Sequence, residues 1–151
     1  MGASSAPSDP APASDREALL GNWKLVSWQV IVENEPPHNP FGTHPKGYLI
    51  LTPEGRSMAI TTAEHRKGGI GDHERAELHR SMLAYTGRYR LEGSDFITTV
   101  EASWNESWNG TEQRRHFRLE GDRLFISSAP APSIVFPGKT DYRELVWERD
   151  K

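Results

Sequence analysis

The stretch Leu19–Trp28, LLGNWKLVSW, marks the point where the folded part of the chain begins. It follows a segment of Ala, Ser and Pro, and it joins a Gly-x-Trp to a run rich in Val, Ile and Trp that continues to Glu33. β-Branched and aromatic residues favour strands, so we expect a long strand over Trp23–Glu33. Apolar residues fall on both faces of this strand. We therefore expect one face to line a barrel interior and the other to be covered from outside.

The composition is typical of one folded domain without polyanionic partners. A chain of 151 residues is long enough to bury roughly 70% of its unfolded surface in a single core. The net charge is -3, from 18 basic and 21 acidic residues, and no run of one sign suggests nucleic acid or an anionic membrane as a partner. The sequence leaves the oligomeric state open.

The N-terminal segment MGASSAPSDPAPAS lacks the basic start and apolar centre of a secretory signal. It also carries too little apolar surface to fold. We therefore expect a disordered tail over residues 1–14, a barrel domain over residues 15–151 and a cytoplasmic location.

Turn residues and alternating patterns predict an all-β protein. Asp15 can cap one helical turn that ends at Gly21, and Leu78, Met82 and Tyr85 recur at helical spacing, which predicts a helix over Asp72–Tyr85. The expected fold is an eight-stranded antiparallel up-and-down barrel with a short N-terminal helical turn and one inserted helix, with a sandwich as the alternative. The expected strands are Trp23–Glu33, Tyr48–Leu51, Ser57–Thr62, Gly87–Glu92, Phe96–Trp104, Thr111–Glu120, Arg123–Ser128 and Tyr142–Arg149.

Trp23 is expected to plug the closed end of such a barrel. Arg149, at the end of the last strand, is the residue that can hold it. A guanidinium stacked on an indole contributes about 0.5–2 kcal/mol, so this pair would stabilise the floor of the barrel.

Five ordered stretches of this chain resemble the bacterial and fungal lipocalin-like domain family. They are LLGNWKLVSW, GYLILTPEGRSMA, YTGRYRL, WNGTEQRRHFRLEGDRL and LVWER, and together they cover nearly everything from Leu19 to Arg149. The Gly-x-Trp and the late basic residue are similar to those of lipocalin and calycin barrels. The resemblance implies a small cup-shaped barrel with an internal cavity. Some lipocalin-like barrels act as cofactor-free cyclases or isomerases in natural-product pathways, so the family implies a fold more firmly than a function.

Side chains alternate along a strand, so parity predicts which residues of TEQRRHFRLE face the interior. The odd positions Gln113, Arg115, Phe117 and Leu119 suit the interior, and the even positions suit solvent. Pairing this strand with the preceding one around NESWNG, with matched parity, places Glu101 opposite Arg115. It also places Ser103 opposite Gln113 and Thr99 opposite Phe117.

Two interpretations of this polar group stay open. In the first, Glu101 and Arg115 neutralise each other and only order the barrel, as buried ion pairs often do. In the second, the group is catalytic: Arg115 and Gln113 bind a carbonyl, enolate or carboxylate, and Glu101 acts as a general base or orients Arg115.

Large apolar side chains form a second candidate set. With Arg143, which shares the parity of Leu145 and Trp147 on the last strand, they are expected to line a pocket for a flat or apolar ligand. Ordinary core filling is the alternative for each of them. The expected lining residues are Tyr48, Met58, Tyr85, Trp104, Trp108 and Phe117.

The six His residues show no metal-binding spacing, so we expect neither a metal ion nor a cofactor. The predicted function is the binding of a small, largely hydrophobic or aromatic organic molecule in the barrel cavity. Two alternatives stay open: a cofactor-independent cyclase, isomerase or lyase, and a structural or interaction domain with a filled barrel. Side chains that fill the interior would favour the structural domain, and a cavity of several hundred Å³ with an open mouth would favour ligand binding or catalysis.

Overall fold

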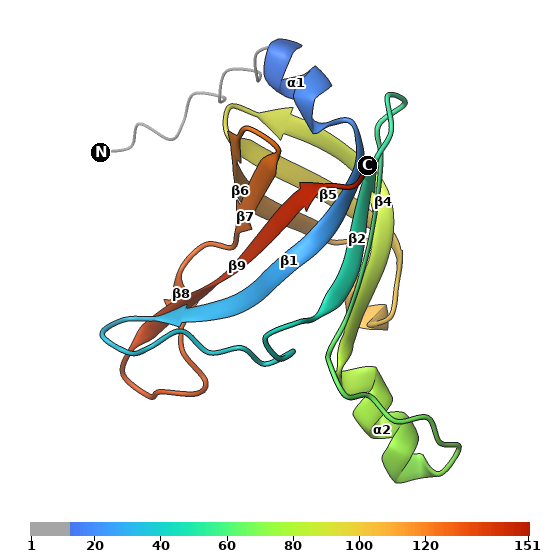
Figure 1. Ribbon diagram of the computed structural model, residues 1–151, viewed down its shortest axis with the longest axis vertical. Helices are drawn as coiled ribbons and strands as arrows, with labels where there is room; N and C mark the ends of the chain where they lie inside the picture. Colours follow the sequence, from blue (N-terminus) through green and yellow to red (C-terminus); the bar gives the residue numbers. More distant parts are fainter. Residues whose placement is uncertain (1–12) are drawn as a thin grey trace.

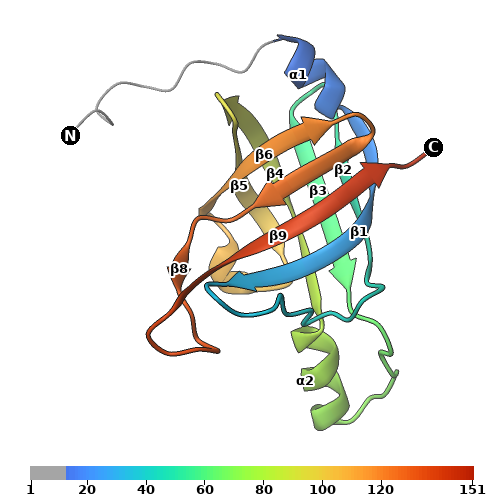
Figure 2. The ribbon, with the colours of Figure 1, turned by 60° about the vertical axis from the view of Figure 1, so that its left-hand side comes forward.

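The computed structural model describes residues 13–151, so the tail predicted over residues 1–14 lies almost entirely outside the described residues. The first helix, α1, spans Ala13–Leu19 and leads directly into β1. α1 lies at one end of the barrel and α2 at the other (Figures 1 and 2).

Eight antiparallel strands close into a barrel, as predicted. The sheet order is β1-β2-β3-β4-β5-β6-β7-β9, and β1 also pairs with β9, which closes the ring. A two-residue strand, β8 (Ala131–Pro132), pairs with the outer end of β9. The barrel strands are β1 (Gly21–Val32), β2 (Lys46–Leu51), β3 (Arg56–Thr62), β4 (Met82–Glu92), β5 (Asp95–Ser103), β6 (Glu112–Glu120), β7 (Arg123–Ser127) and β9 (Thr140–Arg149).

A β-bulge explains why β1 carries apolar residues at both parities. The pairing with β9 shifts between Leu25 and Ser27, which moves the inward-facing positions from odd to even residue numbers. Trp23 and Leu25 are buried before the bulge, and Val30 and Val32 are buried after it. The strand therefore keeps one apolar face toward the interior, which differs from the predicted strand with two covered faces.

The floor of the barrel is the predicted pair of Trp23 and Arg149. Trp23 is fully buried, and its Nε1 donates to the carbonyl of Leu19 over 2.9 Å. The guanidinium carbon of Arg149 lies 3.8 Å from the centre of the Trp23 ring. Arg149 also donates to the carbonyls of Leu20, over 2.6 Å, and of Ala18. One side chain thus joins the last strand, the first strand and α1.

The inserted helix is shorter than predicted. α2 spans Asp72–Arg80, and Met82 and Tyr85 belong to β4 instead of a helical face. Ser81 ends the helix, because its hydroxyl donates back to the carbonyl of Glu77 over 2.8 Å. From Met82 onward the backbone pairs with β3, so tertiary strand pairing overrides the helical spacing of the sequence.

Candidate functional site

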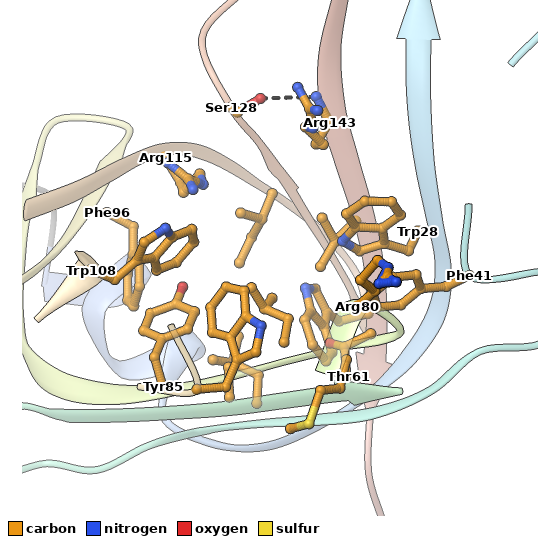
Figure 3. Close-up of a pocket in the computed structure, with 18 residues that line it drawn as sticks. Trp28, Phe41, Thr61, Arg80, Tyr85, Phe96, Trp108, Arg115, Ser128 and Arg143 are labelled. Carbon is orange, nitrogen blue, oxygen red and sulfur yellow. Dashed lines mark hydrogen bonds between the residues drawn. The ribbon is translucent and has the colours of Figure 1, made fainter. Parts of the chain in front are cut away.

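A cavity of about 340 Å³ opens at the end of the barrel where α2 lies. Its wall is mostly apolar and combines side chains from all eight barrel strands with those of α2 and of three connecting segments (Figure 3). The aromatic lining residues are Trp28, Phe41, Tyr85, Phe96, Trp104, Trp108 and Trp147.

The aromatic rings form two groups that hold each other in place. Trp108 lies edge-on to Trp104, with ring centres 4.9 Å apart, and to Tyr85, with ring centres 5.3 Å apart. The second group is the stacked pair of Trp28 and Phe41, whose ring centres are 4.7 Å apart. Such pairs gain about 0.5–1.5 kcal/mol beyond their burial, so the rings present flat, preorganised faces to a ligand.

A short loop between β5 and β6 positions Trp108. The 3-10 helix η2 (Glu106–Trp108) begins after Asn105, whose side chain accepts a hydrogen bond from the backbone N–H of Ser107 over 3.1 Å. His79 of α2 reaches the same loop, with its Nε2 2.9 Å from the carbonyl oxygen of Trp104. α2 therefore contacts the aromatic rim directly.

The ionisable side chains that line the cavity are Arg80, Arg115, Arg143 and Tyr85. Arg115 extends from β6 and is half-buried. It donates to the backbone carbonyl of Arg114 over 2.9 Å and to Oε1 of Gln113 over 3.1 Å. Burial lowers the pKa of Arg115, and the nearby charge of Arg143 acts in the same direction. The cavity wall is therefore positively charged.

Each of the other two Arg side chains has a carboxylate partner. Arg80 lies 3.1 Å from Glu77 on the exposed side of α2. Arg143 lies 3.2 Å from the buried carboxylate of Asp141. The backbone N–H of Arg143 donates to the hydroxyl of Ser128 over 2.8 Å (Figure 3). This hydrogen bond holds this part of β9 against the residue that follows β7.

The predicted pairing of β5 with β6 is wrong. Phe96, not Glu101, lies opposite Arg115. Strand β5 leaves β6 at Val100, and the chain returns at Thr111, where the N–H of Val100 donates to the Thr111 carbonyl over 2.9 Å. The loop that contains η2 is therefore longer than the connection assumed in the predicted pairing, in which residues of matched parity lie opposite each other. A bulge on β5 beside Thr86 and Gly87 also displaces Glu101.

Glu101 lies on the outer wall of the barrel and takes no part in the cavity. Its Oε1 is 2.7 Å from the guanidinium of Arg56. This hydrogen bond lowers the pKa of Glu101, which keeps the carboxylate ionised outside the barrel. The expected internal pair of Glu101 and Arg115 is therefore wrong: Glu101 pairs with Arg56 on the outer wall, and Arg115 makes no ion pair with residues 13–151.

The parity predicted for β6 is confirmed, since the even positions are exposed and the odd positions are buried or half-buried. Gln113 contacts the Arg115 guanidinium and donates to the Thr111 hydroxyl over 2.9 Å, so it orients Arg115 without lining the cavity. Phe117 is buried in the core opposite Ile126 and lies outside the cavity lining.

Four of the predicted lining residues reach the cavity, namely Tyr85, Trp104, Trp108 and Arg143. Tyr48 and Met58 do not, because they point outward from β2 and β3 and are 44% and 48% exposed. Their neighbours Leu49 and Ala59 occupy the inward positions instead. Both faces of this hairpin are apolar, so the sequence alone does not distinguish them.

Sequence reasoning missed several lining residues. Phe96 follows from the true pairing of β5 with β6, and Trp147 from its shared parity with Arg143. Phe41 lies in the long loop after β1, where no periodicity marks it. Arg80 comes from the last residue of α2.

A closed antiparallel barrel with one plugged end and an aromatic cavity at the other defines a cup-shaped single-sheet protein. Residues 20–150 match the lipocalin-like domain family, and the chain belongs to that family. No curated protein matches the chain.

Between residues 13 and 151, no helix has the length and apolar character needed to cross a membrane. In the same part of the chain, no group of three His, Asp or Glu side chains is arranged to hold a metal ion. The cytoplasmic location stays a prediction.

Proposed function

We propose that this protein binds a small, largely hydrophobic or aromatic organic molecule in its barrel cavity. The observation that carries the proposal is an open cavity of about 340 Å³ whose wall includes seven aromatic rings. Ligand pockets in proteins typically start at about 300 Å³ and combine apolar walls with a few polar groups. Membership of the lipocalin-like family supports the same conclusion. A barrel filled by its own side chains would leave no such space.

Titration with N-phenyl-1-naphthylamine, a neutral aromatic fluorophore, tests this proposal. We expect saturable fluorescence enhancement with one site per chain. Ala59 is buried, lines the cavity and lies between Leu49 and Tyr85 on the neighbouring strands. Ala59→Phe should therefore fill the cavity and abolish probe binding.

Ala102→Phe is the matched control. Ala102 lies on β5, is exposed and is outside the cavity lining. This variant should bind the probe as the wild type does, and circular dichroism checks that both variants keep the barrel. Equal binding by all three proteins, or no binding by the wild type, would contradict the proposal.

A cofactor-independent cyclase, isomerase or lyase is the second candidate. It is favoured by the presence of Tyr85 and Arg115 in one cavity. Burial raises the pKa of Tyr85, which keeps its hydroxyl protonated and able to donate a hydrogen bond to a ligand oxygen on which negative charge develops. Arg115 would stabilise the resulting negative charge. Loss of turnover in Tyr85→Phe with unchanged probe binding would support this candidate, and equal turnover would exclude that role for Tyr85.

A further inference from the structure

We infer that the molecule bound in this cavity is an aromatic monoanion with a neutral oxygen at its other end. Its anionic group lies between Arg115 and Arg143, and its neutral oxygen is bound by Trp147 Nε1 and Thr61 Oγ1. This inference rests on the proposed binding function and adds the charge and the orientation of the ligand.

The first observation is that Arg115 has no charged partner among residues 13–151. Among the described residues, its hydrogen bonds go to two neutral oxygens, the Arg114 carbonyl and the Gln113 amide, and it makes no ion pair. Removing part of a guanidinium from water without a carboxylate nearby is costly, and an anion within reach would offset that cost. The planar guanidinium also matches a carboxylate in bidentate geometry.

The second observation is the balance of charge around Arg115. Arg143 is close enough for its charge to disfavour the protonated form of Arg115. Figure 3 draws both guanidinium groups on the same side of the aromatic rings. Asp141 compensates one of the two charges through its contact with Arg143, so one positive charge is left. A ligand with a single negative charge completes this balance.

The third observation is independent of charge: two buried polar atoms in the cavity wall have no hydrogen-bond partner in the part of the chain that the structure describes. Trp147 is 2% exposed and Thr61 is fully buried. Neither Trp147 Nε1 nor Thr61 Oγ1 makes a hydrogen bond to any described residue. Leaving such atoms unpaired costs about 1–3 kcal/mol each. Both residues line the cavity but these two atoms are covered, so a ligand oxygen that displaces the covering side chains can accept from the indole N–H and bond to the hydroxyl.

Strand geometry relates these two polar regions. Arg143 and Trp147 lie on the same face of β9, four residues apart, which corresponds to roughly 13 Å along the strand. Trp147 is nearer the floor, because Arg149 follows it on the strand, and Arg143 is 40% exposed nearer the mouth. An anionic group toward the mouth and a neutral oxygen deeper in the barrel would satisfy both regions, with the aromatic body between them.

Thr61 lies on β3 and Trp147 lies on β9, and β1 and β2 separate these two strands. Trp147 pairs with Leu25 of β1, and Thr61 pairs with Gly47 of β2. A Cβ placed on Gly47 would lie 3.1 Å from Thr61 Oγ1 and 3.2 Å from Leu25 Cδ2, so Thr61 adjoins Leu25, the strand partner of Trp147. In the strand order, β4 and β5 separate β6, which carries Arg115, from β3, which carries Thr61. The ligand therefore extends across the cavity.

Three related probes separate charge from the neutral oxygen. Anthraquinone-2-carboxylate has both features, 2-methylanthraquinone lacks the charge, and anthracene-2-carboxylate lacks the carbonyl groups. Affinities are measured by isothermal titration calorimetry. The wild type should bind anthraquinone-2-carboxylate most tightly. Arg115→Met should weaken both carboxylates by about 10-fold or more, since hydrogen bonds to charged groups are strong, and should leave 2-methylanthraquinone unchanged.

Three further variants test the inference even if Arg115→Met folds poorly. Arg115→Lys retains the charge without the bidentate geometry and should give an intermediate loss for the two carboxylates. Arg123→Met removes one positive charge from an exposed position on β7 and should change none of the three affinities. Trp147→Phe should weaken anthraquinone-2-carboxylate by about 3- to 10-fold, the loss of one hydrogen bond, and leave anthracene-2-carboxylate unchanged.

The outcomes distinguish this inference from the function on which it rests. Equal wild-type affinity for 2-methylanthraquinone and anthraquinone-2-carboxylate would overturn the inference, while the binding function would stand. The same holds if Arg115→Met weakens all three probes equally. Binding of none of the three, together with no binding of N-phenyl-1-naphthylamine, would overturn the proposed function itself.

Discussion

Arg149 and Trp23 join the two ends of the barrel sheet, with the guanidinium carbon 3.8 Å from the centre of the indole ring. They are also direct partners in the pairing of β9 with β1, which closes the barrel. The same guanidinium donates to carbonyls at the junction of α1 and β1. Closure of the sheet, burial of the plug and docking of α1 therefore depend on one side chain.

Arg149→Met should lower the free energy of unfolding by about 2–3 kcal/mol, because it removes a partly buried cation–π contact and two hydrogen bonds. Urea denaturation followed by tryptophan fluorescence measures the change. Arg118→Met is the control: its guanidinium lies 4.1 Å from the Phe125 ring but pairs with Glu120 at the surface. We expect the control to lose less than about 1 kcal/mol. Equal losses would show that Arg149 is no more important than a surface arginine.

Glu101→Gln should leave ligand binding unchanged, because Glu101 lies on the outer wall and bonds to Arg56. It should lower the thermal stability only where the carboxylate is ionised. The pKa of Glu101 is lowered from 4.5 in the folded protein. The contribution of the Glu101 carboxylate to the stability of the folded protein is therefore fully present above pH 4.5 and is lost as the pH falls through the lowered pKa.

Thermal melts of the wild type and Glu101→Gln between pH 3 and pH 7, about the range over which carboxylates titrate, measure this effect. The two melting temperatures should differ at neutral pH and converge in acid. A variant that loses probe binding at neutral pH while keeping its melting temperature would place Glu101 in the site after all.

Whether the sequence places a residue correctly depends on whether local or long-range interactions determine its position. Side-chain alternation is a local property, so the parity of β6 and β9 brought Arg115 and Arg143 into the cavity correctly. The pairing of β5 with β6 depends on the η2 loop and on a bulge, which strand periodicity does not encode. Glu101 was misplaced for that reason.

Two other differences arise from tertiary structure. Tyr48 and Leu49 are both apolar, and only closure of the barrel decides which of them faces inward. Tyr85 has helical spacing from Leu78 in sequence, but pairing with β3 places it on a strand. Phe41 comes from a loop without any pattern, so its stacking on Trp28 follows only from the folded chain.

Gly87 is required by the close approach of two strands. A Cβ at this position would lie 1.9 Å from the carbonyl oxygen of Thr99, which is backbone and cannot move aside. Gly87→Ala should therefore lower the free energy of unfolding by about 2–3 kcal/mol, as overpacking does. Gly68→Ala is the control, because a Cβ there meets nothing within 4 Å. Denaturation curves that coincide for the two variants would contradict this reading of the β4–β5 contact.

Tyr85 should titrate late because its hydroxyl lies in the cavity. Burial raises the pKa of Tyr85 above 10.0, and the positive charge of Arg115 opposes this effect. Its contribution to stability is thus present below pH 10.0 and is lost as the pH rises through the raised value. Burial also raises the pKa of Tyr89, so the late part of the curve contains two of the four tyrosines, and Tyr85→Phe should remove one of these two late contributions, a quarter of the phenolate absorbance.

Arg115→Met supplies the complementary variant for this titration. Without the nearby positive charge, the phenolate of Tyr85 loses its stabilising partner, so the late phase should move to still higher pH. Arg123→Met, which removes an equal charge from the outer surface, should leave the late phase in place. The phenolate is followed in each protein by its absorbance at about 295 nm, where ionised tyrosine absorbs. A late phase that is unchanged in Arg115→Met would mean that the guanidinium does not interact with Tyr85, and the electrostatic account of the cavity would then be wrong.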